Sequence, residues 1–165
     1  MAVINIGAAA IDRATNGAVH MAWLNKENPA NYTGRIKLIK TWLHEPCLTS
    51  FIPAIYYVVA GNTLRCRDLA IFATVAAGYV ETVVDLEVEA GDYIGCYVSE
   101  EMELDSAGGQ GLWYKAGAAG VPSKGNDIDY DFNANWTVSI CGVGLTVAAS
   151  FGGSQADVLV KNALI

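Results

Sequence analysis

Three acidic residues in the stretch EAGDYIGCYVSEEMELD (89–105) have the types and the spacing for acid–base chemistry. Glu101, Glu103 and Asp105 alternate along the chain, and residues i, i+2 and i+4 of a β-strand share one face. Their carboxylates are therefore expected to project together. Retaining glycoside hydrolysis uses two carboxyl groups about 5 Å apart, one as general acid and one as nucleophile. A glycoside hydrolase that uses Glu101 and Glu103 is the sharpest enzymatic hypothesis.

This acidic strand resembles the acid-x-acid-x-acid strand of laminarinase-like glycosidases, whose fold is a β-jelly roll. That family has the order Glu-x-Asp-x-Glu, whereas this chain has Glu-Met-Glu-Leu-Asp, and 165 residues are few for such an enzyme. An acidic strand face that lies in water beside a turn is the alternative, and we favour it.

Other catalytic patterns are weak. The chain has two histidines, and GGSQA (152–156) ends in Ala156 where a nucleophile elbow requires glycine. Neither a P-loop nor a dinucleotide-binding motif occurs in the sequence. The sequence therefore predicts a non-enzyme without a resident cofactor.

A calcium site is one alternative to this prediction. The stretch NDIDYDF places Asp127, Asp129 and Asp131 on one face of a strand, and clustered carboxylate oxygens suit calcium. An EF-hand loop that starts at Asp127 fails, because its sixth position is Phe132 and its twelfth is Val138. A calcium site in a loop of the sandwich stays open.

Aromatic residues offer a second kind of site, a platform for a sugar ring. The core face of the strand near 92–99 is assigned to Ile94, Cys96 and Val98. Tyr93 and Tyr97 then lie on the opposite face, which meets solvent, a ligand or a neighbouring subunit. Trp113 and Tyr114 are adjacent on a strand and point to opposite faces, so that at most one of them faces outward. The predicted platform consists of Tyr93, Tyr97 and Trp113.

The elements that position these residues are short strands. Runs of Val, Ile, Tyr, Thr and Trp closed by Gly, Asn or Asp turns are typical of an all-β sandwich. We expect strands near 2–8, 17–23, 34–43, 48–60, 63–74, 78–88, 92–99, 101–105, 110–116, 127–132, 135–148 and 156–163. The predicted fold is a single-domain antiparallel β-sandwich, jelly-roll-like, over residues 1–148. We expect residues 149–165 to form a Gly-rich hinge and a terminal strand extension that docks on a neighbouring subunit.

The amino-acid composition limits the classes of partner that the protein is expected to bind. The chain is 53% hydrophobic and only 16% charged, against about 25% charged in an average soluble domain. A net charge of −7 argues against a nucleic-acid binder, because such proteins neutralise phosphates. The longest apolar runs, 51–61 and 69–80, are shorter than the roughly 20 residues of a membrane-spanning helix. The start lacks a basic region, so no signal peptide is expected, and we predict that the four cysteines are free thiols.

Both ends of the sequence are apolar and strand-like. MAVINIG (1–7) and ADVLVKNALI (156–165) differ from the polar ends that most domains carry. Apolar segments that a chain does not bury mark contact sites. The predicted contacts with other copies are Val3, Ile4, Ile6, Val158, Val160, Leu164 and Ile165.

Five segments together resemble a β-sandwich module that recurs in virion proteins of bacteriophages, prophages and metagenomes. They are IGAAAIDRAT (6–15), NPANYTGRI (28–36), VVAGNTLRCRD (58–68), VEAGDYIGCY (88–97) and GGQGLWYKAG (108–117). The resemblance implies a jelly-roll-like structural or adhesion module of the virion, without a family active site.

Two functions follow as expectations. The first is a capsid-decorating, coat or filament subunit that assembles with copies of itself, as a trimer or a larger assembly, and that contacts a major capsid protein. The alternative is a carbohydrate-binding or adhesion module, which binds a glycan on the aromatic platform with the help of calcium. Neither function involves nucleic acid or a membrane.

Overall fold

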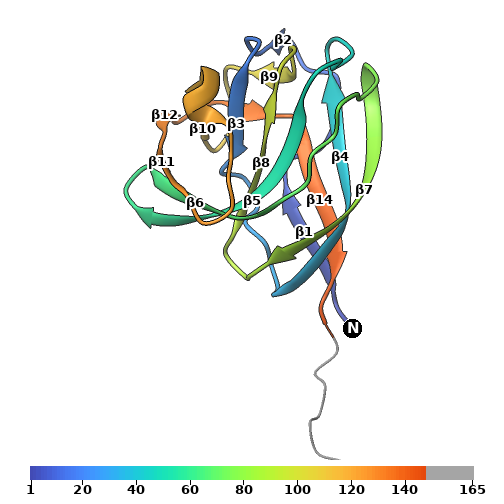
Figure 1. Cartoon of the computed structure of the whole chain (residues 1–165), viewed down its shortest axis with the longest axis vertical. Coiled ribbons are helices and arrows are strands. Elements are labelled where there is room, and N and C mark those ends of the chain that lie inside the picture. The colour runs from blue at the N-terminus through green and yellow to red at the C-terminus, as the bar shows by residue number, and fades with distance from the viewer. Residues whose placement is uncertain (148–165) are drawn as a thin grey trace, which may run out of the picture.

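The computed structural model describes residues 1–147, and these form an all-β domain of packed antiparallel sheets (Figure 1). The predicted class, a single-domain β-sandwich, is confirmed. The expected strands at 34–43 and 78–88 occur with those bounds, whereas the one expected at 127–132 is divided into two. The expected strand at 156–163 and the residues Val158, Val160, Leu164 and Ile165 lie outside the described residues.

One sheet has four strands in the order β1-β14-β4-β7. These strands are β1 (Val3–Gly7), β14 (Ile140–Leu145), β4 (Gly34–Leu43) and β7 (Gly78–Val88). All three pairings are antiparallel, and the register of β14 on β4 shifts between Val143 and Gly144. The two ends of the described chain therefore meet in this sheet.

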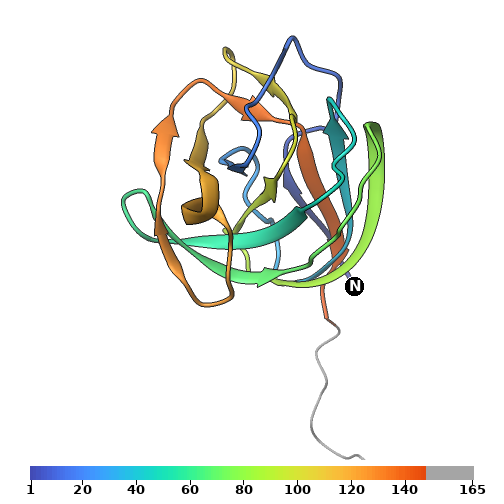
Figure 2. The ribbon, with the colours of Figure 1, turned by 45° about the horizontal axis from the view of Figure 1, so that its top comes forward.

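A second sheet has seven strands in the order β11-β6-β5-β8-β3-β10-β12. Its strands are β11 (Asp127–Asp129), β6 (Thr63–Leu69), β5 (Phe51–Ala60), β8 (Tyr93–Val98), β3 (Met21–Asn25), β10 (Leu112–Ala116) and β12 (Asp131–Asn133). Its two edge strands are consecutive in sequence, since only Tyr130 separates β11 from β12. The segment 127–133 therefore joins the two edges, and the sheet curls into a closed ring (Figure 2).

A small third sheet lies at one end of the molecule. It contains β13 (Thr137–Val138), β9 (Glu103–Asp105) and β2 (Thr15–Asn16), in that order. A single 3₁₀ helix, η1 (Gly117–Gly120), follows β10 in the described chain. The acidic strand β9 thus pairs with the N-terminal segment that precedes β3.

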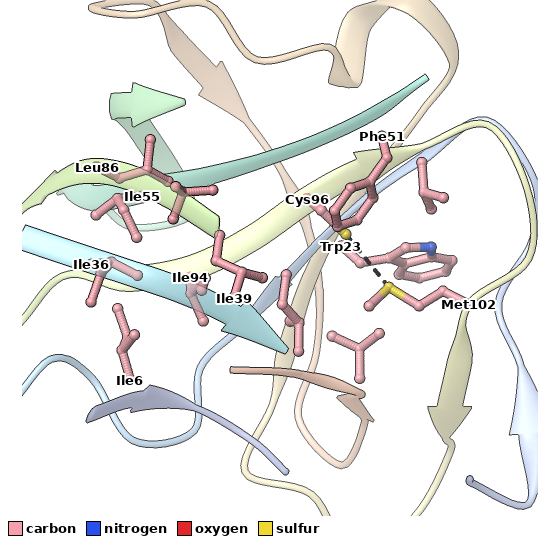
Figure 3. Close-up of a cluster of buried hydrophobic side chains, with 14 of the residues drawn as sticks. Ile6, Trp23, Ile36, Ile39, Phe51, Ile55, Leu86, Ile94, Cys96 and Met102 are labelled. Carbon is pink, nitrogen blue, oxygen red and sulfur yellow. Dashed lines mark hydrogen bonds between the residues drawn. The ribbon is translucent and has the colours of Figure 1, made fainter. Parts of the chain in front are cut away.

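The main core fills the space between the four-stranded sheet and the ring (Figure 3). Ile6, Ile36 and Leu86 approach it from one side, and Phe51 and Ile94 from the other. The prediction that β8 turns Ile94, Cys96 and Val98 to the core is confirmed, since all three side chains are buried there.

A separate core fills the inside of the ring. The alternate residues of the same strands point there, because successive strand residues face opposite sides of a sheet. They are Ala22, Leu24, Ile52, Ala54, Tyr56, Leu64, Cys66, Tyr97, Trp113 and Tyr130. Both faces of β3, β5 and β8 are therefore apolar, which accounts for much of the high hydrophobic content.

The prediction that Ile4 and Ile6 contact other copies is wrong. Their side chains are 0% and 1% exposed because β1 pairs along its length with β14 and turns both side chains into the main core. Val3, on the opposite face of β1, is 52% exposed and stays available for contact.

All four cysteines are free thiols, as predicted. Burial raises the pKa of the Cys66 thiol to about 12 and also raises the pKa of the Cys96 thiol. Both thiols therefore stay protonated and act as small apolar side chains. Across residues 1–147, no helix has the length and apolar character to span a membrane.

Candidate functional site

The acidic strand β9 holds the N-terminal segment 13–16 against the fold. Glu103 is buried, with 3% of its surface exposed, and its Oε2 accepts a hydrogen bond from the backbone N–H of Arg13 at 2.9 Å. Its other oxygen, Oε1, lies 2.8 Å from Nδ1 of His44. This hydrogen bond to Glu103 raises the pKa of His44.

Arg13 makes the second set of contacts with this strand. Its Nη1 donates to Asp105 Oδ2 at 2.7 Å, its Nε donates to Ser139 Oγ at 2.7 Å, and its Nη2 donates to Ala9 O at 3.0 Å. The hydrogen bond from Arg13 lowers the pKa of Asp105. The guanidinium thereby joins the N-terminal segment, β9 and the residue that precedes β14.

The expectation that these acids face water is wrong for Glu103. The carboxylates of Glu101 and Asp105 are partly exposed, and that of Glu101 accepts a hydrogen bond from the side-chain amide of Asn16. Each of the three carboxylates is therefore engaged by a different group of the segment 13–16 or by His44. This arrangement explains the acidic strand as a structural clamp and gives no support to a glycosidase that uses Glu101 and Glu103.

The clamped segment continues into the wall of a pocket of about 260 Å³. The pocket is lined by Asn16, Gly17, Ala18, Met21, Trp23, Leu104, Tyr114 and Trp136. Apart from the indole N–H groups, only Asn16 and Tyr114 have polar side chains in this lining. The pocket therefore offers an apolar, aromatic surface, which is typical of ligand sites.

Three aromatic rings form one wall of this pocket. Tyr114 and Trp136 are stacked, with centroids 5.7 Å apart and an interplanar angle of 28°. Trp23 also contacts Tyr114, with centroids 6.0 Å apart and an interplanar angle of 36°. Because Tyr114 joins both contacts, the three rings form a continuous aromatic surface.

The indole of Trp23 carries an unused hydrogen-bond donor. Its Nε1 is buried and has no acceptor among the described residues. The ring edge packs against Gly17, where an added Cβ would lie 2.6 Å from Cζ2 and 3.2 Å from Nε1. Glycine at this position therefore lets the pocket wall approach the indole. A buried donor without an acceptor costs about 1–3 kcal/mol, so that native structures contain few of them.

The platform predicted from sequence is not at the surface. Trp113 is 3% exposed and Tyr97 is also buried, because the second face of β8 and β10 lies inside the ring. Trp113 Nε1 donates to Asn62 Oδ1 at 3.0 Å, and Tyr93 packs edge-on against Trp113 with centroids 5.0 Å apart. The prediction of an outward platform is wrong for Tyr97 and Trp113, whereas Tyr93 is only partly buried.

The pocket residues Tyr114 and Trp136 were not among the binding residues predicted from the sequence. One signal was present, since Tyr114 must point away from the face that Trp113 occupies. Trp136 comes from the turn before β13, and its position beside Tyr114 depends on how that turn crosses the sheet. No local pattern in the sequence carries that information.

The predicted calcium ligands lie on the outside of the segment that closes the ring. Asp127, Asp129 and Asp131 are exposed, while the residues between them turn inward. Arg65 donates two hydrogen bonds to Asp127, at 2.5 and 2.8 Å, and Thr63 contacts Asp129 at 3.5 Å. Within residues 1–147, no three His, Cys, Asp or Glu side chains are grouped so that they could hold a metal ion.

No protein-family model, curated protein or solved structure matches this chain.

Proposed function

We propose that this protein is a non-enzymatic structural subunit of a virion that assembles with copies of itself. The observation that carries the proposal is an apolar row across the outer face of the four-stranded sheet. The virion role is supported by the resemblance of the five segments described above.

The apolar row crosses β7, β4 and β14, and Asn5 of β1 lies at its end opposite Val143. Val83 of β7 is 79% exposed and lies opposite Leu38 of β4, which in turn lies opposite Val143 of β14. Val3 and Leu145 are paired in the adjacent part of the same face, and both are exposed. Exposed apolar residues that gather on one face mark an interaction surface.

Charged residues on this face favour a second copy as the partner. On β4, Arg35 lies 2.5 Å from Asp85 of β7, and Lys40 lies 3.5 Å from Glu81 of β7. Bases thus follow one strand and acids follow its neighbour. A two-fold axis parallel to the strands would place the acids of one copy over the bases of the other, as an isologous interface requires.

The β1 edge of this sheet is less suited to contact than its face. At the β1 edge, Asn31 accepts from the backbone N–H of Asn5 at 2.9 Å and donates to Val3 O at 3.3 Å. Gly7 N–H donates to Asn28 O at 2.9 Å. These contacts occupy hydrogen-bonding groups that a strand from another copy would need. We therefore place the main contact on the sheet face.

Size-exclusion chromatography with light scattering tests this proposal. The wild-type protein is expected to elute as an oligomer, and Val83→Lys is expected to lose the contact through this face and to elute as a smaller species. Ile71→Lys is the matched control, because Ile71 is 71% exposed but lies outside this sheet. A monomeric wild-type protein at every concentration, with no particles or filaments by negative stain, would refute self-assembly.

Carbohydrate binding is the second candidate function. The stacked rings of Tyr114 and Trp136 in an open pocket favour it, because sugar rings pack on aromatic faces. The few polar side chains of the pocket oppose it, because sugar hydroxyl groups need several hydrogen-bond partners. Binding to a glycan array that is lost in Trp136→Ala would establish this function.

A further inference from the structure

The pocket beside the acidic clamp has the chemistry to receive an apolar peptide segment. Its lining is dominated by Met21, Trp23, Leu104 and the ring pair Tyr114–Trp136, so the group that enters must be apolar. An extended peptide offers apolar groups at regular intervals, since alternate side chains lie on the same face.

One segment of this chain matches that description. Beyond the described residues lie 148–165, and the apolar residues of the segment 156–165 are Ala156, Val158, Leu159, Val160, Ala163, Leu164 and Ile165. Val158 and Val160 have the i, i+2 spacing that places two branched side chains on the same face of an extended segment. We propose that the segment 156–165 of one copy binds in the Trp23–Tyr114–Trp136 pocket of another copy.

The positions of the two features favour binding between copies. β14 ends beside the N-terminus at the bottom of Figure 1, whereas β2 and β9, which flank the pocket, lie at the top; Figure 2 agrees. From Val147 to Val158, eleven residues reach at most about 36–40 Å. A domain of this size has a radius of gyration of about 15 Å, so that a path over its surface from end to end measures roughly 60 Å. The segment therefore reaches a neighbour's pocket more readily than its own.

Contacts of this kind are heterologous and join copies head to tail. They close into a ring or continue as a filament, depending on the rotation between neighbours. This inference rests on the proposed function, in that it takes self-assembly as given. It adds a second contact, which is independent of the sheet face around Val83.

Mixing two full-length variants tests the proposal. Val158→Asp/Val160→Asp removes the apolar face of the segment and keeps the pocket. Ala18→Arg places a charge in the pocket at an exposed position and keeps the segment. Each variant alone is expected to lose head-to-tail assembly, and an equimolar mixture is expected to recover one-to-one pairs. Val19→Arg is the matched control, since the exposed neighbour Val19 does not line the pocket.

A direct measurement follows the fluorescence of Trp23 and Trp136. The synthetic peptide ADVLVKNALI is expected to change the emission of the Val158→Asp/Val160→Asp variant, and Trp136→Ala is expected to weaken binding at least tenfold. Trp136 is only partly buried, which protects the fold in that variant. A panel of monosaccharides serves as the competing ligand class.

The outcomes separate this inference from the proposed function. If Ala18→Arg assembles like the wild type while Val83→Lys does not, the pocket contact is refuted and self-assembly stands. Binding of a sugar without binding of the peptide also refutes the contact. A compact monomer whose pocket rejects added peptide until Val158 and Val160 are changed would show binding within one copy, which contradicts the proposal.

Discussion

Arg13 Nη1 donates to Asp105 Oδ2 at 2.7 Å, although 92 residues separate the two along the chain. The side chain of Arg13 is only 7% exposed, whereas that of Asp105 is 30% exposed. This ion pair ties the N-terminal segment to the acidic strand, and the wall of the aromatic pocket follows immediately after it in sequence.

Arg13→Ala is expected to destabilise the fold by about 1–3 kcal/mol, because it removes the hydrogen bonds of the guanidinium to Asp105, Ser139 and Ala9. Unfolding in urea measures the change in the free energy of unfolding of each variant. Lys37→Ala, which removes an exposed ion pair with Asp85 at 2.5 Å, is the control and is expected to cost less than about 1 kcal/mol. Equal effects of the two variants would contradict the clamp.

The pair His44–Glu103 is expected to make stability depend on pH near neutrality. Glu103 raises the pKa of His44, so that the folded state binds the proton more tightly than the unfolded chain does. The stabilisation is complete below the unfolded pKa of about 6.5 and is lost as the pH rises through the higher folded pKa. His44→Gln should remove this dependence of the unfolding free energy on pH, measured from pH 5 to 9. Glu103→Gln should remove it as well, and a slope that persists in either variant would contradict the assignment.

Asp105 is expected to act in the opposite direction at low pH. Arg13 lowers its pKa, so the stabilisation is present above the unfolded pKa of about 3.9 and is lost as the pH falls through the lower folded value. The acid-unfolding midpoint of Asp105→Asn should therefore be higher than that of the wild type. Asp131→Asn, at an exposed position on the ring, provides the comparison and should leave the midpoint unchanged.

Ile6→Ala is expected to cost about 2–5 kcal/mol of folding free energy, because it opens a cavity between the sheets. Val3→Ala, on the outer face of the same strand, should cost less than about 1 kcal/mol. Guanidinium unfolding of both variants tests whether β1 belongs to the core. A small effect at Ile6 would restore the idea that this strand serves mainly as a contact with other copies.

Trp113→Ala is expected to cost about 3–5 kcal/mol of folding free energy. The ring fills the inside of the closed sheet, and its Nε1 donates a hydrogen bond to Asn62. Trp136→Ala should cost less, because Trp136 is only partly buried and lies at the pocket. The midpoint temperatures of thermal unfolding show which of the two variants loses more stability. The reverse order would return Trp113 to the surface as a binding residue.

Local sequence determined the strands and the faces of several of them. The alternation in YIGCYV places Ile94, Cys96 and Val98 in the main core, and the Gly and Asn turns bound β4, β5 and β7 close to the expected positions. Periodicity carries this information because each strand residue faces the side opposite to its neighbour.

Only the tertiary structure decided which faces are solvent. A period of two shows that Tyr97 lies opposite Cys96, but the closure of the seven-stranded sheet through Tyr130 turns that second face into another core. The same holds for Glu103, whose burial depends on Arg13 and His44 arriving from distant parts of the chain. The pocket arises in the same way, because Trp23, Tyr114 and Trp136 meet through pairings between strands that no local pattern records.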